Sequence, residues 1–388
     1  MRKITTSLIQ GYALHRPPTG HSQAHSGVHP LSPLTHQTQR FEPLPPPLGL
    51  PPYHYLLETA LPGIGALAAQ HGKIVFHIVG DTGGIKDPHF QIGVADAMEK
   101  DLSLPADQAP SFFYHLGDVV YFNGEISEYY PQFYEPYKFY TAPIISIPGN
   151  HDGAPIDASQ TSLDGWIRYF MTDAPHINPE SQDAQRVTMS LPNVYFTLDA
   201  PFVTIVGMYT NVPEHGSIDS VQQQWLTNEL ATASKDKALI VAMHHPIYSF
   251  DNHHSGSPNM ADALQHAIND SRRVPNIVFA AHVHDYQRIE KPIVTGTVTP
   301  FIVAGGGGYH NLHQVTVPAG TTDPATNATL IFGDSAHHGY LTLTVDAAHI
   351  SGTYTTTDPP TSPPTTGVDT FQYPAVAQFL PDSMVVSL

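Results

Sequence analysis

Short apolar runs recur along the middle of the chain, and most of them end in polar residues. They are rich in Val, Ile, Phe and Ala and have the length of buried strands, over residues 74–79, 111–116, 143–147, 203–207, 238–243, 276–280 and 300–304. Helical periodicity separates several runs, over residues 87–102, 220–234 and 260–270. The alternation predicts an α/β fold of four layers, in which two packed mixed β-sheets, closed by strands over 340–345 and 350–356, are flanked by helices.

The two ends of the chain differ from its middle. Residues 1–72 are rich in Pro, His, Gln and Thr. They show neither the alternation of a strand nor the periodicity of a helix, so we expect an extended amino-terminal arm there. Residues 358–388 form a Pro- and Thr-rich tail without a clear element. One folded domain is therefore expected over residues 73–357, a length that single α/β domains reach.

Composition narrows the class of protein. Of the 388 residues, 41% are hydrophobic and 13% are charged, which is typical of a globular chain and not of a disordered one. The net charge of −18 argues against a nucleic-acid partner and against attraction to an anionic membrane. No apolar run has the length of a membrane span. An anionic substrate would therefore need something other than Lys and Arg to hold it.

The absence of cysteine limits the chemistry further. It excludes disulfides, thiolate zinc sites, iron–sulfur clusters and cysteine nucleophiles, and it leaves His, Asp, Asn and Tyr as the available ligands. The first twenty residues match a signal peptide poorly, because polar residues interrupt their apolar positions. The cytoplasm is the default compartment, and the periplasm or secretion fits the composition as well.

Chemically useful side chains follow the apolar runs. Ligands in α/β folds bind outside the carboxyl ends of strands, so these are the positions to compare. The residues in question are Asp81, Asp118, Tyr121, Asn150 and His151 after the first three runs, and His244, His282 and His284 after the runs over 238–243 and 276–280. Asp, Tyr, Asn and His are hard or borderline ligands, so the pattern predicts a metal site at the carboxyl ends of the strands.

None of these short motifs is specific alone. A chain with 25 histidines is expected to contain a His-x-His triplet by chance, and Gly-Asp after a strand is usually a turn. Five motifs in order, each at the end of an expected strand, are a stronger signal: Asp-x-Gly, Gly-Asp-x-x-Tyr, Gly-Asn-His-Asp, Val-x-x-His and His-x-His. Together they resemble the calcineurin-like metallophosphoesterase superfamily, and in particular its purple acid phosphatase branch, over residues 81–284.

The resemblance implies a pair of metal ions. One would be held by Asp81, Asp118, Tyr121 and His284, and the other by Asp118, Asn150, His244 and His282, with Asp118 bridging both. Most of the superfamily has a histidine where this chain has Gly83, whereas Tyr121, three residues after the bridging aspartate, fits the purple branch. A phenolate favours a ferric ion, so the implied cofactors are Fe(III) with Fe, Zn or Mn(II) as the second ion.

Three further histidines complete the implied site. His151 follows Asn150 and is expected to give a proton to the leaving group. His253 and His254 come nine and ten residues after His244, where the resemblance places a pair of substrate-binding histidines. The surrounding sequence DNHHSG also fits an exposed polar loop, so both interpretations of this pair stay open.

Some neighbouring positions depart from the family pattern or extend it. Ala281 stands where a glycine is usual. His245 follows His244, and alternation along a strand points the two side chains to opposite faces, so only one can be a ligand; His244 fits the motif. Asp152 and Asp285 are expected to orient neighbouring histidines.

The implied function is that of an acid phosphatase, which hydrolyses phosphate monoesters of a small substrate by attack of a metal-bound hydroxide, with residues 73–357 as the catalytic domain. A phosphodiesterase or a nucleotide pyrophosphohydrolase would use the same metal centre. A non-catalytic binding protein of the same fold is the alternative from another class. A metal-storage role is suggested only by histidines of the arm, whose spacing in a Pro-rich coil matches no ordered site: His15, His21, His25, His29 and His36.

Overall fold

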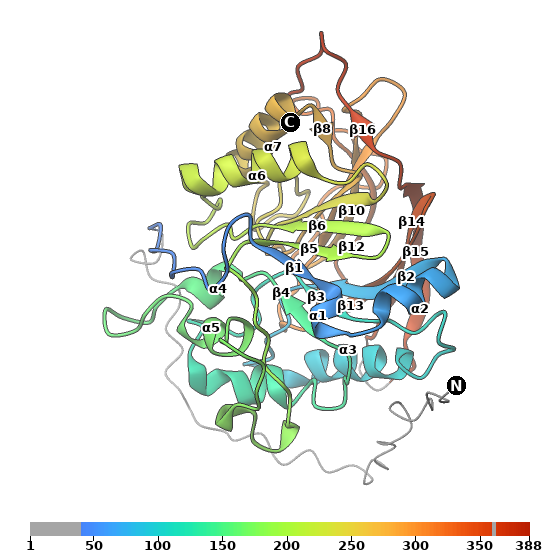
Figure 1. The fold of residues 1–388 in the computed structure, drawn as a ribbon. Helices are drawn as coiled ribbons and strands as arrows, with labels where there is room; N and C mark the ends of the chain where they lie inside the picture. The colour runs from blue at the N-terminus through green and yellow to red at the C-terminus, as the bar shows by residue number, and fades with distance from the viewer. Residues whose placement is uncertain (1–39, 359–361) are drawn as a thin grey trace, which may run out of the picture. The chain divides into compact units, whose positions relative to one another are not determined.

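Two mixed β-sheets form the core of the protein (Figure 1). The computed structural model describes residues 40–358 and 362–388. One sheet has eight strands in the order β1-β5-β6-β7-β9-β11-β10-β12, and the other has six in the order β15-β14-β13-β2-β3-β4. The predicted fold class, two mixed sheets flanked by helices, is confirmed.

The eight-stranded sheet contains β1 His54–Leu56, β5 Phe196–Ala200, β6 Val203–Gly207, β7 Ala238–Ala242, β9 Ile277–Ala280, β10 Tyr286–Lys291, β11 Thr299–Ala304 and β12 Thr329–Asp334. Strands β6, β7, β9 and β11 are parallel neighbours. Every residue of β6, β7 and β9 is buried. Burial on both faces explains why these strands are continuous apolar runs in the sequence.

The six-stranded sheet contains β2 Lys73–Val79, β3 Phe113–His115, β4 Ile144–Ser146, β13 Gly339–Asp346, β14 His349–Thr356 and β15 Thr365–Pro374. Strands β2, β3 and β4 are parallel, whereas β13, β14 and β15 add to β2 as antiparallel neighbours. A short separate ribbon pairs β8 Arg273–Val274 with β16 Gln378–Phe379. Two sets of parallel strands, one in each sheet, therefore provide carboxyl ends for a site.

The three long helices match the predicted ones: α3 Pro88–Asp101, α6 Ser220–Thr232 and α7 Pro258–Ser271. Asp219 caps α6 by accepting a hydrogen bond from the backbone of Gln222. Figure 1 shows α6 and α7 side by side on the outer side of the larger sheet and α3 beyond the smaller one. Shorter helical segments are α1 Leu57–Ala60, α2 Ile64–His71, α4 Asn150–Gly153, α5 Asp164–Phe170, η2 Ile126–Glu128, η3 Tyr130–Tyr134 and η4 Pro179–Ala184.

Two regions expected to be irregular contain regular elements, so the prediction was wrong there. Residues 54–71 of the expected arm form β1, α1 and α2, and residues 365–374 of the expected tail form β15. Strand β1 pairs with β5 and β15 pairs with β14. Pairing with a remote strand stabilises a segment whatever its own periodicity. The predicted domain limits remain a prediction, and the five histidines of the arm lie outside the described residues.

The sheets approach each other closely at the end of β2. The backbone N–H of Gly80 donates to the carbonyl of Ala304 at 2.9 Å, and that of Gly307 donates to the carbonyl of Gly80 at 3.1 Å. A Cβ atom on Gly80 would lie 2.6 Å from the Cβ of Ala281. The strand ends can meet because Gly80 has no side chain, and the methyl group of Ala281 fits beside it. In the part of the chain that the structure describes, no helix has the length and hydropathy needed to cross a membrane.

Candidate metal centre

The seven predicted ligand residues come together where the two sheets meet. Asp81 follows β2, Asp118 and Tyr121 follow β3, Asn150 begins α4 after β4, His244 follows β7, and His282 and His284 follow β9. All seven are buried. The carboxyl ends of two sets of parallel strands therefore deliver seven polar side chains to one enclosed place, although their role as metal ligands remains a prediction.

One half of this cluster contains Asp81, Tyr121 and His284. The Tyr121 hydroxyl donates to Asp81 Oδ1 at 3.0 Å and lies 3.2 Å from His284 Nε2. His284 Nε2 also lies 3.6 Å from Asp81 Oδ1. The other ring nitrogen, Nδ1, bonds to the Asn311 carbonyl at 3.0 Å and must be the donor, so in the neutral ring the Nε2 lone pair faces the cluster.

The other half contains Asp118, Asn150, His244 and His282. His244 Nδ1 donates to the Leu116 carbonyl at 2.9 Å, so the Nε2 lone pair of the neutral ring faces Asn150 Oδ1 at 3.0 Å and Asp118 Oδ2 at 3.3 Å. His282 Nδ1 also lies 3.0 Å from Asn150 Oδ1. Asp118 Oδ2 is buried and has no hydrogen-bond partner. Asp118 Oδ2, Asn150 Oδ1 and His244 Nε2 direct lone pairs at one another and need a shared positive charge, either a proton or a metal ion.

Without a metal ion, the pKa values indicate that a proton on His244 supplies this positive charge. Burial by itself lowers the pKa of His244, but the carboxylates of Asp118 and Asp81 raise it to about 9. Burial raises the pKa of Asp81 to about 7. Burial lowers the pKa of His282 and of His284 to about 3, so both rings stay neutral. Neutral imidazoles beside carboxylates suit divalent and trivalent cations, and a cation would replace the His244 proton.

The backbone of the site is held in an unusual conformation. Asp81, Asp118 and His282 have φ angles of 55°, 53° and 67°, in the left-handed region that residues other than glycine seldom occupy. The turns are held by the same carboxylates: the backbone N–H of His282 donates to Asp81 Oδ2 at 2.7 Å, and that of His151 donates to Asp118 Oδ1 at 2.9 Å. Such local strain is concentrated at functional sites. Ligand atoms of Asp81, Asp118 and His244 all lie within 4.8 Å of one another.

Tyr121 fills the space that a side chain at position 83 would need. A Cβ atom on Gly83 would lie 2.8 Å from the Tyr121 ring and 2.5 Å from Gln132 Oε1. Gln132 holds the Tyr121 backbone through bonds of 2.9 and 2.8 Å, and the Tyr309 ring stacks on the Tyr121 ring at 4.2 Å. Burial and the carboxylates of Asp81 and Asp118 raise the pKa of Tyr121 well above its usual value, so the metal-free phenol keeps its proton. The Tyr121 ring can thus occupy this position because residue 83 has no side chain.

The three predicted histidines of the mechanism lie at the border of the cluster. His151 is half-buried; its Nδ1 donates to the Phe122 carbonyl at 2.9 Å, and its ring lies 4.5 Å from that of Tyr121. The His254 ring packs 4.3 Å from the His282 ring, and exposed His253 lies 4.5 Å from His254. The structure therefore brings all three close to the seven buried residues.

Two residues beside the site were not predicted from the sequence. Glu214, in the segment between β6 and α6, accepts a hydrogen bond from His254 Nδ1 at 2.5 Å. His313, after β11, is buried, stacks on the His284 ring at 4.4 Å and accepts the backbone N–H of His284 at 3.3 Å. Neither follows a predicted strand directly, so the strand-end rule that found the other residues gave no signal for them.

The expected roles of Asp152 and Asp285 were wrong. The Asp152 carboxylate accepts backbone N–H groups of Gly149 at 2.8 Å and Val119 at 3.1 Å, which ties two site loops together. The Asp285 carboxylate accepts from the Gln287 amide at 2.9 Å. Backbone carbonyls orient His244 and His284 instead. His245 Nδ1 bonds to the Thr210 hydroxyl at 2.7 Å, and its ring packs 4.3 Å from that of His282.

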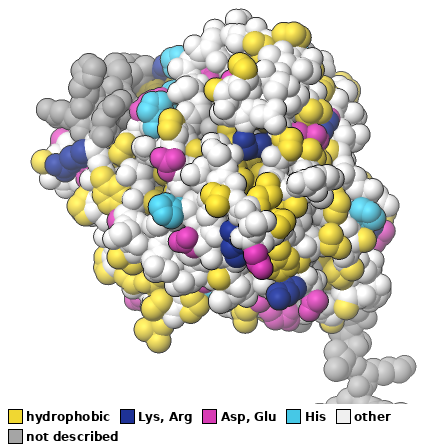
Figure 2. Space-filling view, turned by 90° about the horizontal axis from the view of Figure 1, so that it is seen from above, with side chains coloured by type: hydrophobic (Ala, Val, Ile, Leu, Met, Phe, Trp, Pro, Cys, Tyr) yellow, Lys and Arg dark blue, Asp and Glu magenta, His cyan; other side chains and the backbone are white. Residues whose placement is uncertain are grey.

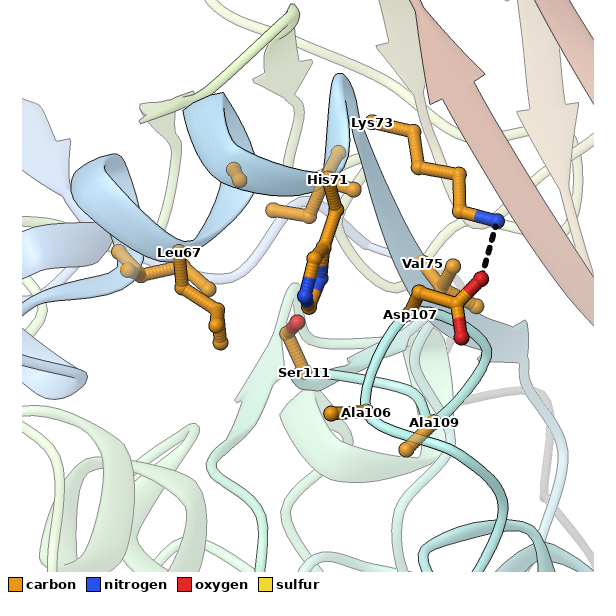
Figure 3. Close-up of a pocket in the computed structure, with 11 residues that line it drawn as sticks. Leu67, His71, Lys73, Val75, Ala106, Asp107, Ala109 and Ser111 are labelled. Atoms are coloured by element: carbon orange, nitrogen blue, oxygen red, sulfur yellow. Dashed lines mark hydrogen bonds and ion pairs between the residues drawn. The ribbon is translucent and has the colours of Figure 1, made fainter. Parts of the chain in front are cut away.

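Two pockets in the described residues lie away from this cluster. The pocket of Figure 3, beneath α2, has a volume of about 10 Å³, and its polar wall is the Lys73–Asp107 ion pair at 3.3 Å. It has room for one water molecule and no organic ligand. A second pocket of about 430 Å³ is lined by Tyr55, Tyr169 and Arg186 among others, and contains none of the predicted site residues. Figure 2 shows one face of the molecule, on which Lys and Arg side chains are interspersed with acidic ones.

Comparison with known proteins identifies the family. The sequence model of calcineurin-like phosphoesterases matches residues 74–286, which is more than half of the chain and includes every residue of the cluster. The chain belongs to the calcineurin-like phosphoesterase family. The resemblance inferred from the five motifs is therefore confirmed.

The relatives of this chain include purple acid phosphatases. It is 30% identical over 177 residues to purple acid phosphatase 21 of Arabidopsis thaliana, a match that covers 43% of this chain and 37% of the relative. The chain thus spans well under half of that curated relative.

Solved structures of low sequence identity share its fold. A purple acid phosphatase from yellow lupin seeds (Lupinus luteus) matches with a TM-score of 0.54 and 19% identity, over 77% of this chain and 53% of that one. GAP50, the anchor in the inner membrane complex of Plasmodium, matches with a TM-score of 0.55 and 14% identity, over 79% of this chain and 90% of that one. The same fold therefore occurs in a phosphatase and in a protein described as an anchor.

Proposed function

We propose that this protein hydrolyses phosphate monoesters with the help of two metal ions, as an acid phosphatase does. Membership of the phosphoesterase family and similarity to purple acid phosphatases support the reaction class. The observation that carries the proposal is that Asn150 Oδ1 and Asp118 Oδ2 lie 3.0 and 3.3 Å from His244 Nε2, with no donor between them in the neutral state. A buried arrangement of this kind suits a cation.

The donor set fits two ions of different character. Asp81, Asp118, Tyr121 and His284 would hold a ferric ion, while Asp118, Asn150, His244 and His282 would hold a second iron, zinc or manganese ion. When bound, such a pair supplies Lewis-acid activation of water and positive charge for the phosphoryl oxygens. That charge explains how a chain of net charge −18 can bind an anionic substrate.

Residues of the chain itself provide orientation and a proton. His151 Nδ1 donates to the Phe122 carbonyl at 2.9 Å, so Nε2 is the nitrogen left for the leaving group, and it gives a proton to the leaving oxygen from the imidazolium form of the ring. His253 and His254 bind non-bridging phosphoryl oxygens at the border of the site. Asp118 holds the turn that carries His151 through the backbone bond of 2.9 Å, which keeps the acid close to the reacting atoms.

A non-catalytic binding role is the second candidate, because the anchor GAP50 shares the fold over 90% of its length. The two candidates differ in whether the polar strand ends are needed. A scaffold requires no buried carboxylates. Burial of Asp81 and Asp118 lowers the stability of the fold, and such a cost is typical of a functional site.

Elemental analysis combined with a panel of phosphomonoesters and phosphodiesters tests the proposal. We expect two ions per chain, iron among them, and faster hydrolysis of monoesters. Asp118→Asn should lose both ions and nearly all hydrolysis, whereas Asp236→Asn, at an exposed loop position, should behave like the wild type. Folded wild-type protein without bound ions or hydrolysis would favour the scaffold, and faster hydrolysis of diesters would favour the phosphodiesterase or pyrophosphohydrolase alternative.

A further inference from the structure

One carboxylate contacts both a proposed metal ligand and a proposed substrate-binding residue. Glu214 Oε1 lies 2.5 Å from His254 Nδ1 and 3.8 Å from His282 Nε2. The His254 and His282 side chains are 17% and 6% exposed, and their rings pack at 4.3 Å. The Glu214 side chain is 38% exposed, so it is the most solvent-accessible of the three.

The hydrogen-bonding pattern fixes what Glu214 does to each ring. A carboxylate can only accept, so His254 Nδ1 carries the proton and Nε2 is the nitrogen that remains for a ligand. His282 Nδ1 faces Asn150 Oδ1 at 3.0 Å inside the metal cluster, and with an ion held at Nδ1 the proton of the neutral His282 ring would be on Nε2. His282 Nε2 is buried and has no hydrogen-bond partner within bonding distance. Glu214 Oε1, 3.8 Å away, places a negative charge beside it.

The segment that carries Glu214 is well anchored. The Ser217 backbone N–H donates to the Thr210 carbonyl at 2.8 Å, and the Asn259 amide donates to the Gly216 carbonyl at 2.8 Å. The Ser257 hydroxyl donates to the His215 carbonyl. These contacts tie the segment to the start of α7, so the carboxylate is held in place by the fold and not by the histidines alone.

We propose that Glu214 is a positioning residue that orients His254 for the phosphoryl group and that its negative charge, 3.8 Å from His282 Nε2, favours the proton on that nitrogen and so strengthens the hold of this ring on the second metal ion. This inference rests on the proposed function. A carboxylate behind a metal-bound imidazole makes the ring a better ligand and fixes its orientation, and removing such a partner costs 10- to 100-fold in metal affinity or activity. Through Glu214, retention of the second ion and binding of substrate depend on one side chain.

Glu214→Gln tests this with little change of shape. In metal-loaded protein, we expect the second ion to bind about 10-fold more weakly, measured by equilibrium dialysis against a chelator, while the first ion is retained. The Kd of inorganic phosphate, measured by calorimetry, and KM should rise several-fold, with a smaller change in kcat. Glu180→Gln is the matched control, because it also removes a partly buried carboxylate, one that pairs with Arg168 at 2.7 Å. It should leave both affinities unchanged.

A second background separates the two effects. In His254→Ala, the change Glu214→Gln should no longer weaken phosphate binding but should still weaken retention of the second ion through His282. If Glu214→Gln weakens phosphate binding as much in this background as it does in the wild type, the assignment to His254 is overturned. Unchanged ion retention would overturn the assignment to His282. If the wild type bound a third ion that Glu214→Gln does not bind, the carboxylate would itself be a metal ligand, and the positioning role would be overturned.

A measurement on the wild type keeps the inference testable if the variants fail to fold. Nitrogen-15 spectra of the zinc-loaded protein should show His254 protonated at Nδ1 and His282 protonated at Nε2, and the opposite tautomer of either ring would contradict the inference. The proposed function is refuted by a different result, namely wild-type protein that binds no ions or hydrolyses no ester. If the wild type binds ions and hydrolyses esters but Glu214→Gln behaves identically, only the inference about Glu214 is refuted.

Discussion

Removal of the metal ions should make the stability of the protein depend steeply on pH, mainly because of Asp81. Burial raises the pKa of this carboxyl to about 7, from an ordinary value of 3.8. A carboxyl whose pKa is raised by folding binds its proton more tightly in the folded state, so stability is lost as the pH rises from the unfolded to the folded value. Each pKa unit is worth about 1.4 kcal/mol, so the shift costs about 4 kcal/mol by pH 8.

His244 acts in the same direction. Its pKa is raised to about 9 from 6.5 by Asp118 and Asp81, against the effect of burial. The stability that this raised value contributes is fully present below pH 6.5 and disappears as the pH rises through 9. A bound cation favours an ionised Asp81 and a neutral His244, so it removes the cost of ionising Asp81 and takes the place of the stabilising His244 proton. Metal-loaded protein should therefore keep its stability over the pH range in which the metal-free protein loses it.

Urea unfolding at pH 5 to 9, with and without a chelator, measures this difference. In Asp81→Asn the titrating carboxyl is absent, so the metal-free variant should be more stable than metal-free wild type at pH 8 and should depend less on pH. Asp236→Asn, an exposed loop position, serves as the control. Metal-free wild type of constant stability between pH 5 and 8, or an Asp81→Asn variant with the wild-type slope, would refute the reasoning.

Three further predictions concern the chemistry. Tyr121→Phe should abolish a visible absorption band of the iron-loaded protein, and a colourless but active wild type would contradict the phenolate assignment. His151→Ala should slow esters with poor leaving groups at least 10-fold more than activated esters, and equal slowing of both would exclude a role as general acid. Gly83→Ala, whose Cβ would lie 2.8 Å from the Tyr121 ring, should lower stability by about 1 to 3 kcal/mol and weaken the first ion, as urea unfolding and dialysis would reveal. A variant as stable as wild type would show that Tyr121 can move aside.

The strands that deliver the site could be predicted from the sequence. Strands β2, β3, β4, β7 and β9 are buried, so each is a continuous apolar run that ends where the chain becomes polar. Parallel neighbours have their carboxyl ends at one edge, so the residues after such runs are brought together by the topology itself. For that reason Asp81, Asp118 and Asn150, which follow parallel neighbours of one sheet, could be grouped without knowledge of any contact between them, whereas His244 follows a strand of the other sheet and was added through its motif.

Only the tertiary structure decided what surrounds these residues. His244 and His284 are oriented by the carbonyls of Leu116 and Asn311, and a backbone carbonyl leaves no trace in the side-chain sequence. Glu214 reaches His254 from a loop 40 residues away. Strand β15 exists because β14 offers it hydrogen-bond partners. Apolar periodicity is a local property that the sequence displays directly, whereas these contacts join segments that are distant along the chain and adjacent only after folding.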